Sequence, residues 1–270
     1  MYFIYGRKKL MKKRAMAAVS AVMCASMVLS ACGSSASTST TAAPAETKAA
    51  EESKTEETTA AAASGDVVTI NIGFENTTEE PIGQAVEKWA ELLKEESNGT
   101  MELKVFANSA LGNKSKLIDQ MVMGENVITI ADGAFYADYG VPDLGILYGP
   151  FFFDNWDEVW KLIDSDWYKE QCSKLADKGL TVLGSNWVYG ERELMTKDKA
   201  VVPADIKGKK IRLANSQIYV EGFNALGATA VPMALGDVYT ALQNGTLDGV
   251  ENPLSTLYGQ SFQEVTKNIL

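Results

Sequence analysis

The apolar residues after position 66 recur with two different periods along the chain. In Val67–Phe74 every second residue is apolar and several are β-branched, a pattern that predicts a strand. In Pro81–Glu96 the apolar residues fall three or four positions apart, which places them on one face of a helix. The same two patterns predict strands at Met101–Phe106, Val127–Ala131 and Leu180–Ser185, and helices at 113–123 and Trp156–Lys178, with Ser165-Asp166 as a break signal in the second helix.

The stretch Asp205–Pro253 shows the alternation of strands and helices most clearly. Asn215 or Ser216 can cap the first of its two helices, and Gly227 and Gly245 can end the two helices. Strands that alternate with helices pair in parallel through right-handed crossovers. The predicted strands of this stretch are Lys209–Ala214, Ala228–Met233 and Leu247–Glu251.

The earlier part of the chain repeats this order. The segments LIDQMVMGENVITIAD and VYTALQNGTLDGVEN both run from a helix through a glycine and a strand to an acidic residue. We therefore expect an α/β protein of two similar lobes, each with a mixed, mostly parallel sheet. The expected boundaries are residues 66–188 for the first lobe and 189–270 for the second. Tyr136–Phe153 is expected to be a loop, and Phe262–Ile269 an amphipathic helix.

The composition excludes several classes of function. The formal net charge is −10, and the first 31 residues hold six basic residues and no acidic one, which leaves 19 basic against 35 acidic residues and a charge of −16 for the rest. So acidic a body argues against nucleic acid as a partner. The chain contains no histidine, which excludes serine–histidine or cysteine–histidine catalysis and a histidine-ligated zinc. No cofactor or metal is indicated, although hydrolysis by paired carboxylates stays open.

The N-terminal segment has the pattern of a secretory signal. In residues 11–31, a basic start precedes an apolar run that is shorter than the ~20 residues of a spanning helix. Leu29-Ser30-Ala31-Cys32 resembles a bacterial lipobox, in which cleavage leaves Cys32 as the first residue, carrying a lipid. An uncleaved membrane anchor is the alternative. Residues 1–10 add nothing to the signal, so Met11 is a more natural start than Met1.

The next segment, residues 32–65, consists almost entirely of serine, threonine, alanine, glutamate and lysine. Such a composition cannot bury enough apolar surface to fold. As a flexible chain it would span ~30 Å, from about 5–6 Å × √n. We expect a disordered tether that holds the folded body outside the cytoplasmic membrane.

Arg212 is the charged residue that the strand pattern singles out. It falls near the carboxyl end of a predicted strand and just before a helix, and ligands bind at that edge of open parallel sheets. The unpaired N–H groups of a helix N-terminus favour anions. A guanidinium can also hold a carboxylate with two parallel hydrogen bonds. From chemistry alone, an exposed arginine at a strand end is an equal alternative.

The same region carries a family resemblance. "GKKIR" followed by "GATAVPMALGDVYTALQNGTLDGVENP" resembles the central region of the substrate-binding subunits of tripartite ATP-independent periplasmic (TRAP) transporters, the DctP-like proteins. A weaker similarity extends back to Val67. The resemblance implies a two-lobed periplasmic-binding-protein fold with a ligand cleft between the lobes. It also implies a further return to the first lobe and C-terminal helices beyond Leu270, so that the first lobe is expected to lack a returning strand here.

Matched to the family's motif, four residues fall on positions that bind the ligand. Arg212 falls on the arginine that grips the carboxylate and Arg192 on a second pocket arginine, for which a surface pair with Glu191 or Glu193 is the alternative. Asn252 falls on the asparagine of "ENP", or is a turn residue before Pro253. Asn215 falls on a pocket asparagine, or is a helix cap. These four, with the three that follow, are the candidate site: Arg212, Arg192, Asn252, Asn215, Glu75, Asp132 and Trp187.

Glu75 and Asp132 follow predicted strands of the first lobe, where the family carries polar residues that face the cleft. A carboxylate there would repel the charged end of an acid but would accept hydrogen bonds from hydroxyl groups, which favours a hydroxylated acid over a plain dicarboxylate. The two could instead be a hydrolase pair, which requires carboxyls about 5–10 Å apart. Trp187 and Tyr189 lie in residues 186–192, the crossover where the chain passes from the first lobe to the second and which the resemblance implies is an inter-lobe hinge. Both could stack on a sugar ring, although packing of the hinge is the favoured interpretation.

The resemblance implies a solute-binding protein without enzymatic activity. It would capture a sugar acid or dicarboxylate outside the cytoplasmic membrane, anchored by lipid at Cys32, and deliver it to TRAP permease subunits driven by an ion gradient. The alternatives are the binding protein of an ATP-driven (ABC-type) importer, which lacks this arginine–"ENP" pattern, and a secreted carboxylate-dependent hydrolase.

Overall fold

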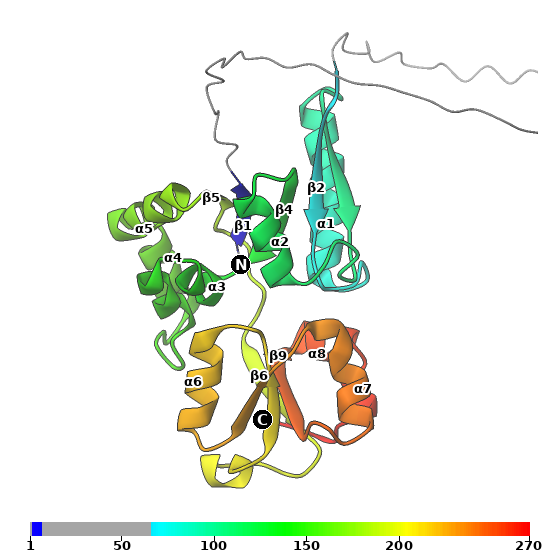
Figure 1. Ribbon diagram of the computed structural model, residues 1–270, viewed down its shortest axis with the longest axis vertical. Helices are drawn as coiled ribbons and strands as arrows, with labels where there is room; N and C mark the ends of the chain where they lie inside the picture. Colours follow the sequence, from blue (N-terminus) through cyan, green and yellow to red (C-terminus); the bar gives the residue numbers. More distant parts are fainter. Residues whose placement is uncertain (1, 7–65) are drawn as a thin grey trace, which may run out of the picture. The chain divides into compact units, whose positions relative to one another are not determined.

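The computed structural model describes residues 2–6 and 66–270 (Figure 1). The expected signal peptide (11–31), the tether (32–65) and the lipidation site Cys32 lie outside the described residues. Within the part that is described, no helix is both long enough and apolar enough to cross a bilayer. The described residues build two five-stranded sheets, which we call sheet A and sheet B.

Sheet A has the strand order β3-β2-β4-β1-β5. Its first three strands in that order are parallel, and β1 runs antiparallel to both of its neighbours. The strands are β1 (Tyr2–Gly6), β2 (Val68–Gly73), β3 (Met101–Phe106), β4 (Val127–Ala131) and β5 (Leu180–Gly184). The helical segments are α1 (Pro81–Glu96), α2 (Lys114–Val122), α3 (Gly133–Asp138), η1 (Pro142–Tyr148), α4 (Trp156–Ile163) and α5 (Asp166–Asp177).

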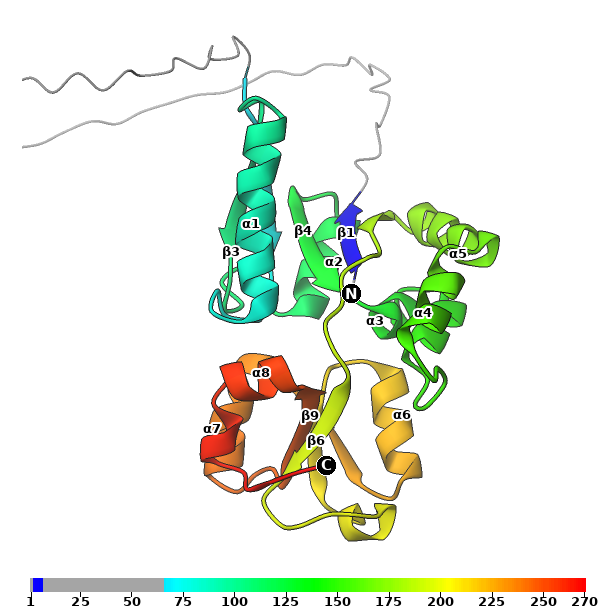
Figure 2. The ribbon, with the colours of Figure 1, turned by 180° about the vertical axis from the view of Figure 1, so that it is seen from behind.

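Helices cover both faces of sheet A, and the central strand β4 is therefore buried throughout. Ile128 and Ile130 of this strand pack in one cluster with Val86 of α1, which runs along β3 (Figure 2). Val127 and Ala131 alternate with them and pack in a second cluster with residues of α2 and α5. A strand buried on both faces reads as a continuous apolar run, as this one does.

The position between β4 and β5 is filled by β1, the first strand of the chain (Figure 1). Phe3 pairs with Ile130 on one side and with Gly184 on the other. The family resemblance led us to expect that sheet A lacks a returning strand, and we expected residues 1–10 to add nothing to the secretory signal. Among the described residues, this N-terminal segment pairs with both β4 and β5, and its residues 2–5 are all large apolar or aromatic residues, which suit a strand.

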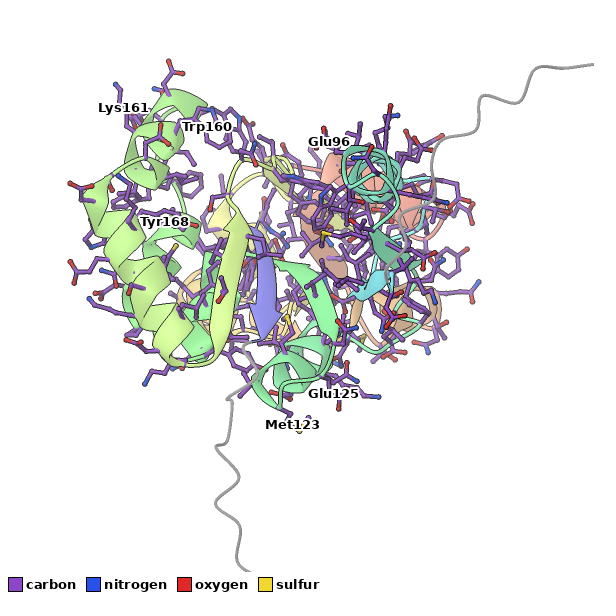
Figure 3. All side chains as sticks on the ribbon, turned by 90° about the horizontal axis from the view of Figure 1, so that it is seen from above. Glu96, Met123, Glu125, Trp160, Lys161 and Tyr168 are labelled. Carbon is purple, nitrogen blue, oxygen red and sulfur yellow. The ribbon has the colours of Figure 1, made fainter. Side chains whose placement is uncertain are left out.

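The expected helix Trp156–Lys178 divides into α4 and α5 at the predicted break. Ser165 caps α5 by accepting a hydrogen bond from the Tyr168 N–H at 3.2 Å, which ends one helix and begins the next. Tyr168 points from α5 toward the sheet, whereas Lys161 of α4 points outward (Figure 3). The Tyr168 hydroxyl lies 2.9 Å from that of Ser185, just after β5.

Sheet B has the order β10-β6-β9-β7-β8. β8, β7 and β9 are parallel, β6 is antiparallel to β9, and β10 is antiparallel to β6. The strands are β6 (Arg192–Thr196), β7 (Lys210–Leu213), β8 (Thr229–Pro232), β9 (Gly249–Pro253) and β10 (Asn268–Ile269). The helical segments are η2 (Pro203–Ile206), α6 (Gln217–Ala225), η3 (Leu235–Asp237), α7 (Val238–Gln243), α8 (Leu254–Gly259) and η4 (Phe262–Glu264).

Sheet B is also covered on both faces, by α6 on one and by α7 and α8 on the other (Figures 1 and 2). Ile211 and Leu213 pack toward α6 through Tyr219. Val250 packs on the opposite face, with Leu242 of α7. In each sheet three parallel strands follow the chain order second, first, third and extend through antiparallel pairings, so the predicted α/β architecture with two similar lobes is confirmed.

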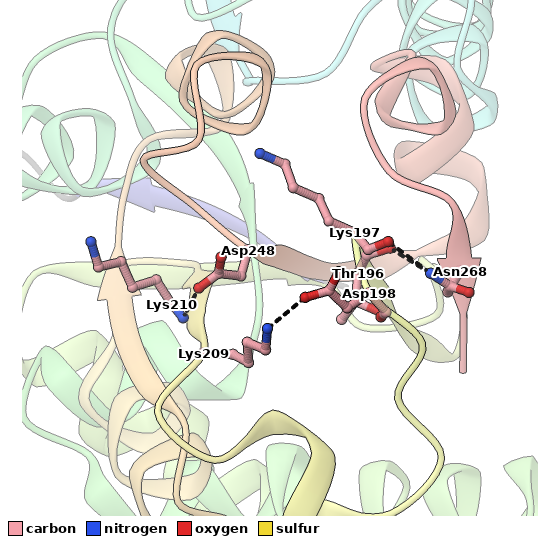
Figure 4. Close-up of polar contacts among 7 residues, drawn as sticks. All are labelled: Thr196, Lys197, Asp198, Lys209, Lys210, Asp248 and Asn268. Atoms are coloured by element: carbon pink, nitrogen blue, oxygen red, sulfur yellow. Dashed lines mark hydrogen bonds and ion pairs between the residues drawn. The ribbon is translucent and has the colours of Figure 1, made fainter.

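Polar contacts fasten sheet B at the amino ends of its parallel strands (Figure 4). The Lys210 N–H donates to Asp248 at 2.8 Å, and the Asn268 amide of β10 donates to the Lys197 carbonyl at 2.9 Å. These contacts lie at the edge of the sheet opposite to the one at which β7 and β9 end. They leave the carboxyl edge to other residues.

Two loop and helix predictions are wrong. Residues 136–153, expected to be a loop, contain the end of α3 and all of η1. Residues 262–269, expected to be an amphipathic helix, form only η4 and the two-residue strand β10. Segments this short carry too few residues for a helical period to be told from chance, and tertiary contacts decide their conformation.

Candidate functional site

Residues from both sheets line one cavity of about 190 Å³. The first lobe contributes Glu75, just after β2, and residues from the first turns of α2 and α3, whereas the second lobe contributes Arg212 of β7, Pro232 of β8 and residues that follow these two strands. The lining residues are Glu75, Asn113, Lys114, Ser115, Phe135, Arg212, Ala214, Asn215, Pro232, Met233 and Ala234.

Arg212 supplies the buried charge of this cavity. It lies on β7 next to the strand's end, and only 3% of the residue is exposed. Its Nε and Nη2 atoms donate to the Met233 carbonyl at 2.9 and 2.6 Å, and none of the described carboxylates forms an ion pair with it. Burial lowers the pKa of Arg212, and the nearby carboxylates Glu75 and Glu251 act in the opposite sense. A buried cation without an ion pair favours an anionic ligand.

Arg192 does not line the cavity. Its Nη2 donates to Glu251 Oε1 at 2.7 Å in a bidentate ion pair, and its guanidinium stacks over the rings of Tyr148 and Tyr219, 5.4 and 5.0 Å from their centroids. Burial alone would lower the pKa of Arg192, but Glu251 and the tyrosines more than offset that effect and hold its pKa above the ordinary value. Neither expected partner, Glu191 or Glu193, is the one it pairs with.

Strand register explains why the two arginines have different surroundings. Arg212 lies opposite Val250, and side chains of opposite residues share a face of the sheet. Leu194 lies opposite Glu251, one position along β9, and Arg192 is two residues from Leu194. The two arginines therefore project from opposite faces of sheet B. The structure corrects the expectation that both line one pocket.

Asn252 and Trp187 also lie outside the cavity lining. Asn252 is buried in β9, opposite Glu193, rather than in a turn before Pro253. Trp187 packs edge-to-face on Trp89 of α1 with ring centroids 6.2 Å apart. The hinge-packing interpretation of Trp187 therefore fits the structure.

The two carboxylates of the first lobe have separate roles. Glu75 lines the cavity, and its Oε1 atom accepts from the Leu235 N–H at 3.5 Å, across from sheet B. Asp132 instead caps α3 by accepting from the Ala134 N–H at 3.0 Å and is not part of the lining. Of these two carboxylates, the cavity is therefore lined by Glu75 and not by Asp132.

Asn215 lines the cavity and does not cap the following helix. Ser216 is the residue at the cap position of α6, and its hydroxyl donates to the Ala134 carbonyl at 3.1 Å. The Asn215 amide lies 3.5 Å from the Ser115 hydroxyl, so it faces the residues that sheet A contributes. Of the seven candidate residues, the structure brings Arg212, Asn215 and Glu75 together at the cavity.

Sequence reasoning placed the start of α2 correctly but missed that its residues line the cavity. Asn113 caps this helix through the Lys116 N–H at 3.0 Å, as predicted, but Asn113, Lys114 and Ser115 also line the cavity. The Lys114 ammonium lies 4.8 Å from the centroid of the Phe135 ring. The signal was available, because this helix begins after β3 at the same sheet edge as Glu75.

A buried polar network joins the two sheets beside the cavity. The Asn76 amide, just after Glu75, donates to Tyr189 Oη at 3.0 Å and to Thr256 Oγ1 at 3.1 Å, and these two hydroxyls lie 2.7 Å apart. Glu80 accepts from Asn76 and from Gln260, each at 2.7 Å. The network thus connects the first lobe, the crossover and α8.

A sequence profile of the bacterial extracellular solute-binding proteins, family 7 (DctP), matches residues 72–270. The chain belongs to this family. The chain is 31% identical over 188 residues to the C4-dicarboxylate-binding periplasmic protein DctP of Rhodobacter capsulatus, covering 70% of this chain and 56% of that protein. It is 32% identical over 201 residues to the 2,3-diketo-L-gulonate-binding periplasmic protein YiaO of Escherichia coli, covering 74% and 60%.

Solved structures agree with this assignment to family 7. A TRAP periplasmic solute-binding protein from Ochrobacterium anthropi, with bound L-fuconate, is 42% identical and superposes with a TM-score of 0.73. That superposition covers 75% of this chain and 67% of the other. The present family-7 chain therefore spans a little over half the length of the curated relatives it matches.

Proposed function

We propose that this family-7 protein captures an organic acid between its two lobes and delivers it to an ion-gradient-driven TRAP permease. The observation that carries the proposal is Arg212, a buried guanidinium without an ion pair among the described residues, in a cavity lined from both sheets. The ligands named for the three similar proteins described above, L-fuconate, 2,3-diketo-L-gulonate and C4-dicarboxylates, are carboxylic acids.

Closure of the two lobes on a ligand is supported by the fact that both lobes contribute residues to the cavity. Arg212 and Asn215 come from sheet B, whereas Glu75, Lys114 and Phe135 come from sheet A. A ligand that contacts both groups binds the closed arrangement better than an open one and shifts the population toward it. The closed form is the state that a permease would receive. The proposal includes a lipid anchor at Cys32, which would hold the protein outside the cytoplasmic membrane.

Calorimetry with a panel of sugar acids, dicarboxylates and 2-oxo acids tests the proposal. We expect one or more acids to bind with micromolar or tighter affinity. Arg212→Ala should weaken binding by at least 100-fold, because the loss of one partner of a buried charge pair costs about 3–5 kcal/mol. Lys210→Ala is the matched control, since it removes an exposed cation from the same strand.

Two results would count against the proposal. One is binding that survives Arg212→Ala as well as it survives Lys210→Ala, because the acid would then be held elsewhere. The other is chemical turnover of any member of the panel, which would favour an enzyme.

A further inference from the structure

The cavity holds a second cation besides Arg212. Lys114 begins α2 and lines the cavity, and its ammonium lies over the Phe135 ring. Among the described residues, no carboxylate forms an ion pair with Lys114. Contact with an aromatic face stabilises an ammonium only modestly, so its charge acts on whatever occupies the cavity.

Glu75 brings a negative charge into the same cavity. Its Oε1 atom accepts from the Leu235 N–H at 3.5 Å, the outer limit of a hydrogen bond, so the carboxylate keeps most of its capacity to accept. Its charge also opposes the burial that lowers the pKa of Arg212. The carboxylate and the two cations therefore act on one another across the cavity.

The charges of the lining can be added, because the neighbouring ion pair contributes none. Arg192 and Glu251 neutralise each other in their own buried contact. The lining itself contains two cations, Lys114 and Arg212, and one carboxylate, Glu75. The described site thus carries one net positive charge. A ligand with a single negative charge neutralises it, and a ligand with two leaves an uncompensated charge in a partly buried place.

We propose that Glu75 acts as a charge filter that selects singly charged acids in a site whose positive charge Arg212 and Lys114 supply; this rests on the proposed function. Arg212 binds the carboxylate. Glu75 accepts hydrogen bonds from hydroxyl groups of the ligand and repels a second carboxylate, while Lys114 donates to oxygen atoms of the same end. The site therefore takes hydroxylated monocarboxylates and rejects the corresponding dicarboxylates.

Matched pairs of acids test the filter. Galactonate and galactarate share a carbon chain and differ only in whether the far carbon is a hydroxymethyl group or a carboxylate, and gluconate and glucarate form a second such pair. At pH 7.5 these acids carry one and two charges. Calorimetry on the full chain should show the monoanion of the pair binding at least tenfold more tightly.

The variants separate the two roles. Glu75→Gln keeps the shape and removes the charge, and it should lower the monoanion-to-dianion affinity ratio at least tenfold. Lys114→Met should weaken both acids and weaken the dianion more. Glu79→Gln and Lys116→Met are the matched controls, because each removes the same charge from an exposed side chain nearby, and neither should change the ratio.

Each outcome decides between the two proposals. Arg212-dependent binding with a preference for the dianion, or a ratio that Glu75→Gln leaves unchanged, overturns the charge filter and leaves the proposed function intact. If none of the four acids binds, and no acid of the wider panel binds either, the proposed function fails and the filter fails with it. If a different acid of the panel binds, its monoanion and the dianion with the same carbon skeleton are compared. Tighter binding of that dianion overturns the filter.

Discussion

Two arginines of one sheet illustrate how burial acts on a single residue. Arg192 is held by Glu251 and two tyrosine rings, so its charge is satisfied within the protein. Arg212 donates only to a backbone carbonyl among the described residues, so its charge is left for a ligand. The same type of side chain is thus structural at one position and a binding group at the other. The difference follows from the face of sheet B on which each arginine lies, which is set by the pairing of β6 and β7 with β9.

The ion pair of Arg192 leads to a prediction about stability. Arg192→Leu leaves Glu251 buried without a partner, which should lower the free energy of unfolding by about 3–5 kcal/mol. The double variant Arg192→Leu/Glu251→Leu replaces both charges with apolar groups and should recover much of that loss. Urea unfolding of the three proteins measures the difference. A double variant no more stable than the single one would mean that packing, not charge, sets the cost.

At the scale of elements, the network of Asn76, Tyr189 and Thr256 links the crossover to both sheets. Burial is the main cause that raises the pKa of Tyr189 to about 12, while its hydrogen bonds and Arg192 act against it. An unfolded tyrosine has a pKa of about 10. Because the folded pKa is the higher one, the folded state retains the proton over this interval and loses stability as pH rises through it.

This shift predicts an alkaline loss of stability that Tyr189→Phe removes. Between pH 10 and pH 12 the contribution of Tyr189 should fall by about 2–3 kcal/mol, from about 1.4 kcal/mol per pKa unit. The variant has no hydroxyl to ionise, so its stability should fall less steeply over the same range. Unfolding of both proteins at several pH values up to 11 measures the two slopes. Equal slopes would show that other tyrosines account for the effect.

The elements themselves were largely predictable from sequence, and the site was predictable only in part. α1 and β3 have the predicted bounds, and Gly124 and Gly245, with φ of 83° and 81°, end their helices as expected, because period and glycine are local signals. Strand β9 begins two residues later than predicted. The partner of Arg192 depends on the register between strands 59 residues apart, which no local pattern contains.

Missed residues have the same explanation. Lys114 reads as an ordinary solvated lysine at a helix start, and only the meeting of two sheet edges makes it a cavity residue. Asp132 follows β4 as predicted, yet the helix that begins after it takes its carboxylate as a cap. The strand-end rule locates the edge of a site well, but it does not say which side chains at that edge remain available.

At the scale of the whole molecule, strand β1 connects the folded body to the extreme N-terminus of the chain. β1 makes antiparallel ladders with both β4 and β5, two strands that are otherwise not joined to each other. Without it, sheet A would present two unpaired strand edges, and such edges favour association with other chains.

We predict that the chain shortened to begin at residue 11 loses protection in these two strands. Amide hydrogen exchange should accelerate in 127–131 and 180–184, whose backbone groups bond to β1, while β7 and β8 in the other sheet serve as the internal control. Light scattering should show more self-association of the shortened chain. Unchanged exchange in both strands would mean that β1 contributes little to sheet A.

Export processing would give β1 a further significance. Cleavage before Cys32 releases everything upstream of that cysteine, and Tyr2–Gly6 lies upstream. The precursor and the lipid-bearing product would then differ in the number of strands in a folded sheet, not merely in the loss of a leader. A protein matured in this way would need another strand in the place of β1. Until such a strand paired there, the backbone groups of β4 and β5 that bond to β1 would be free to pair with another chain.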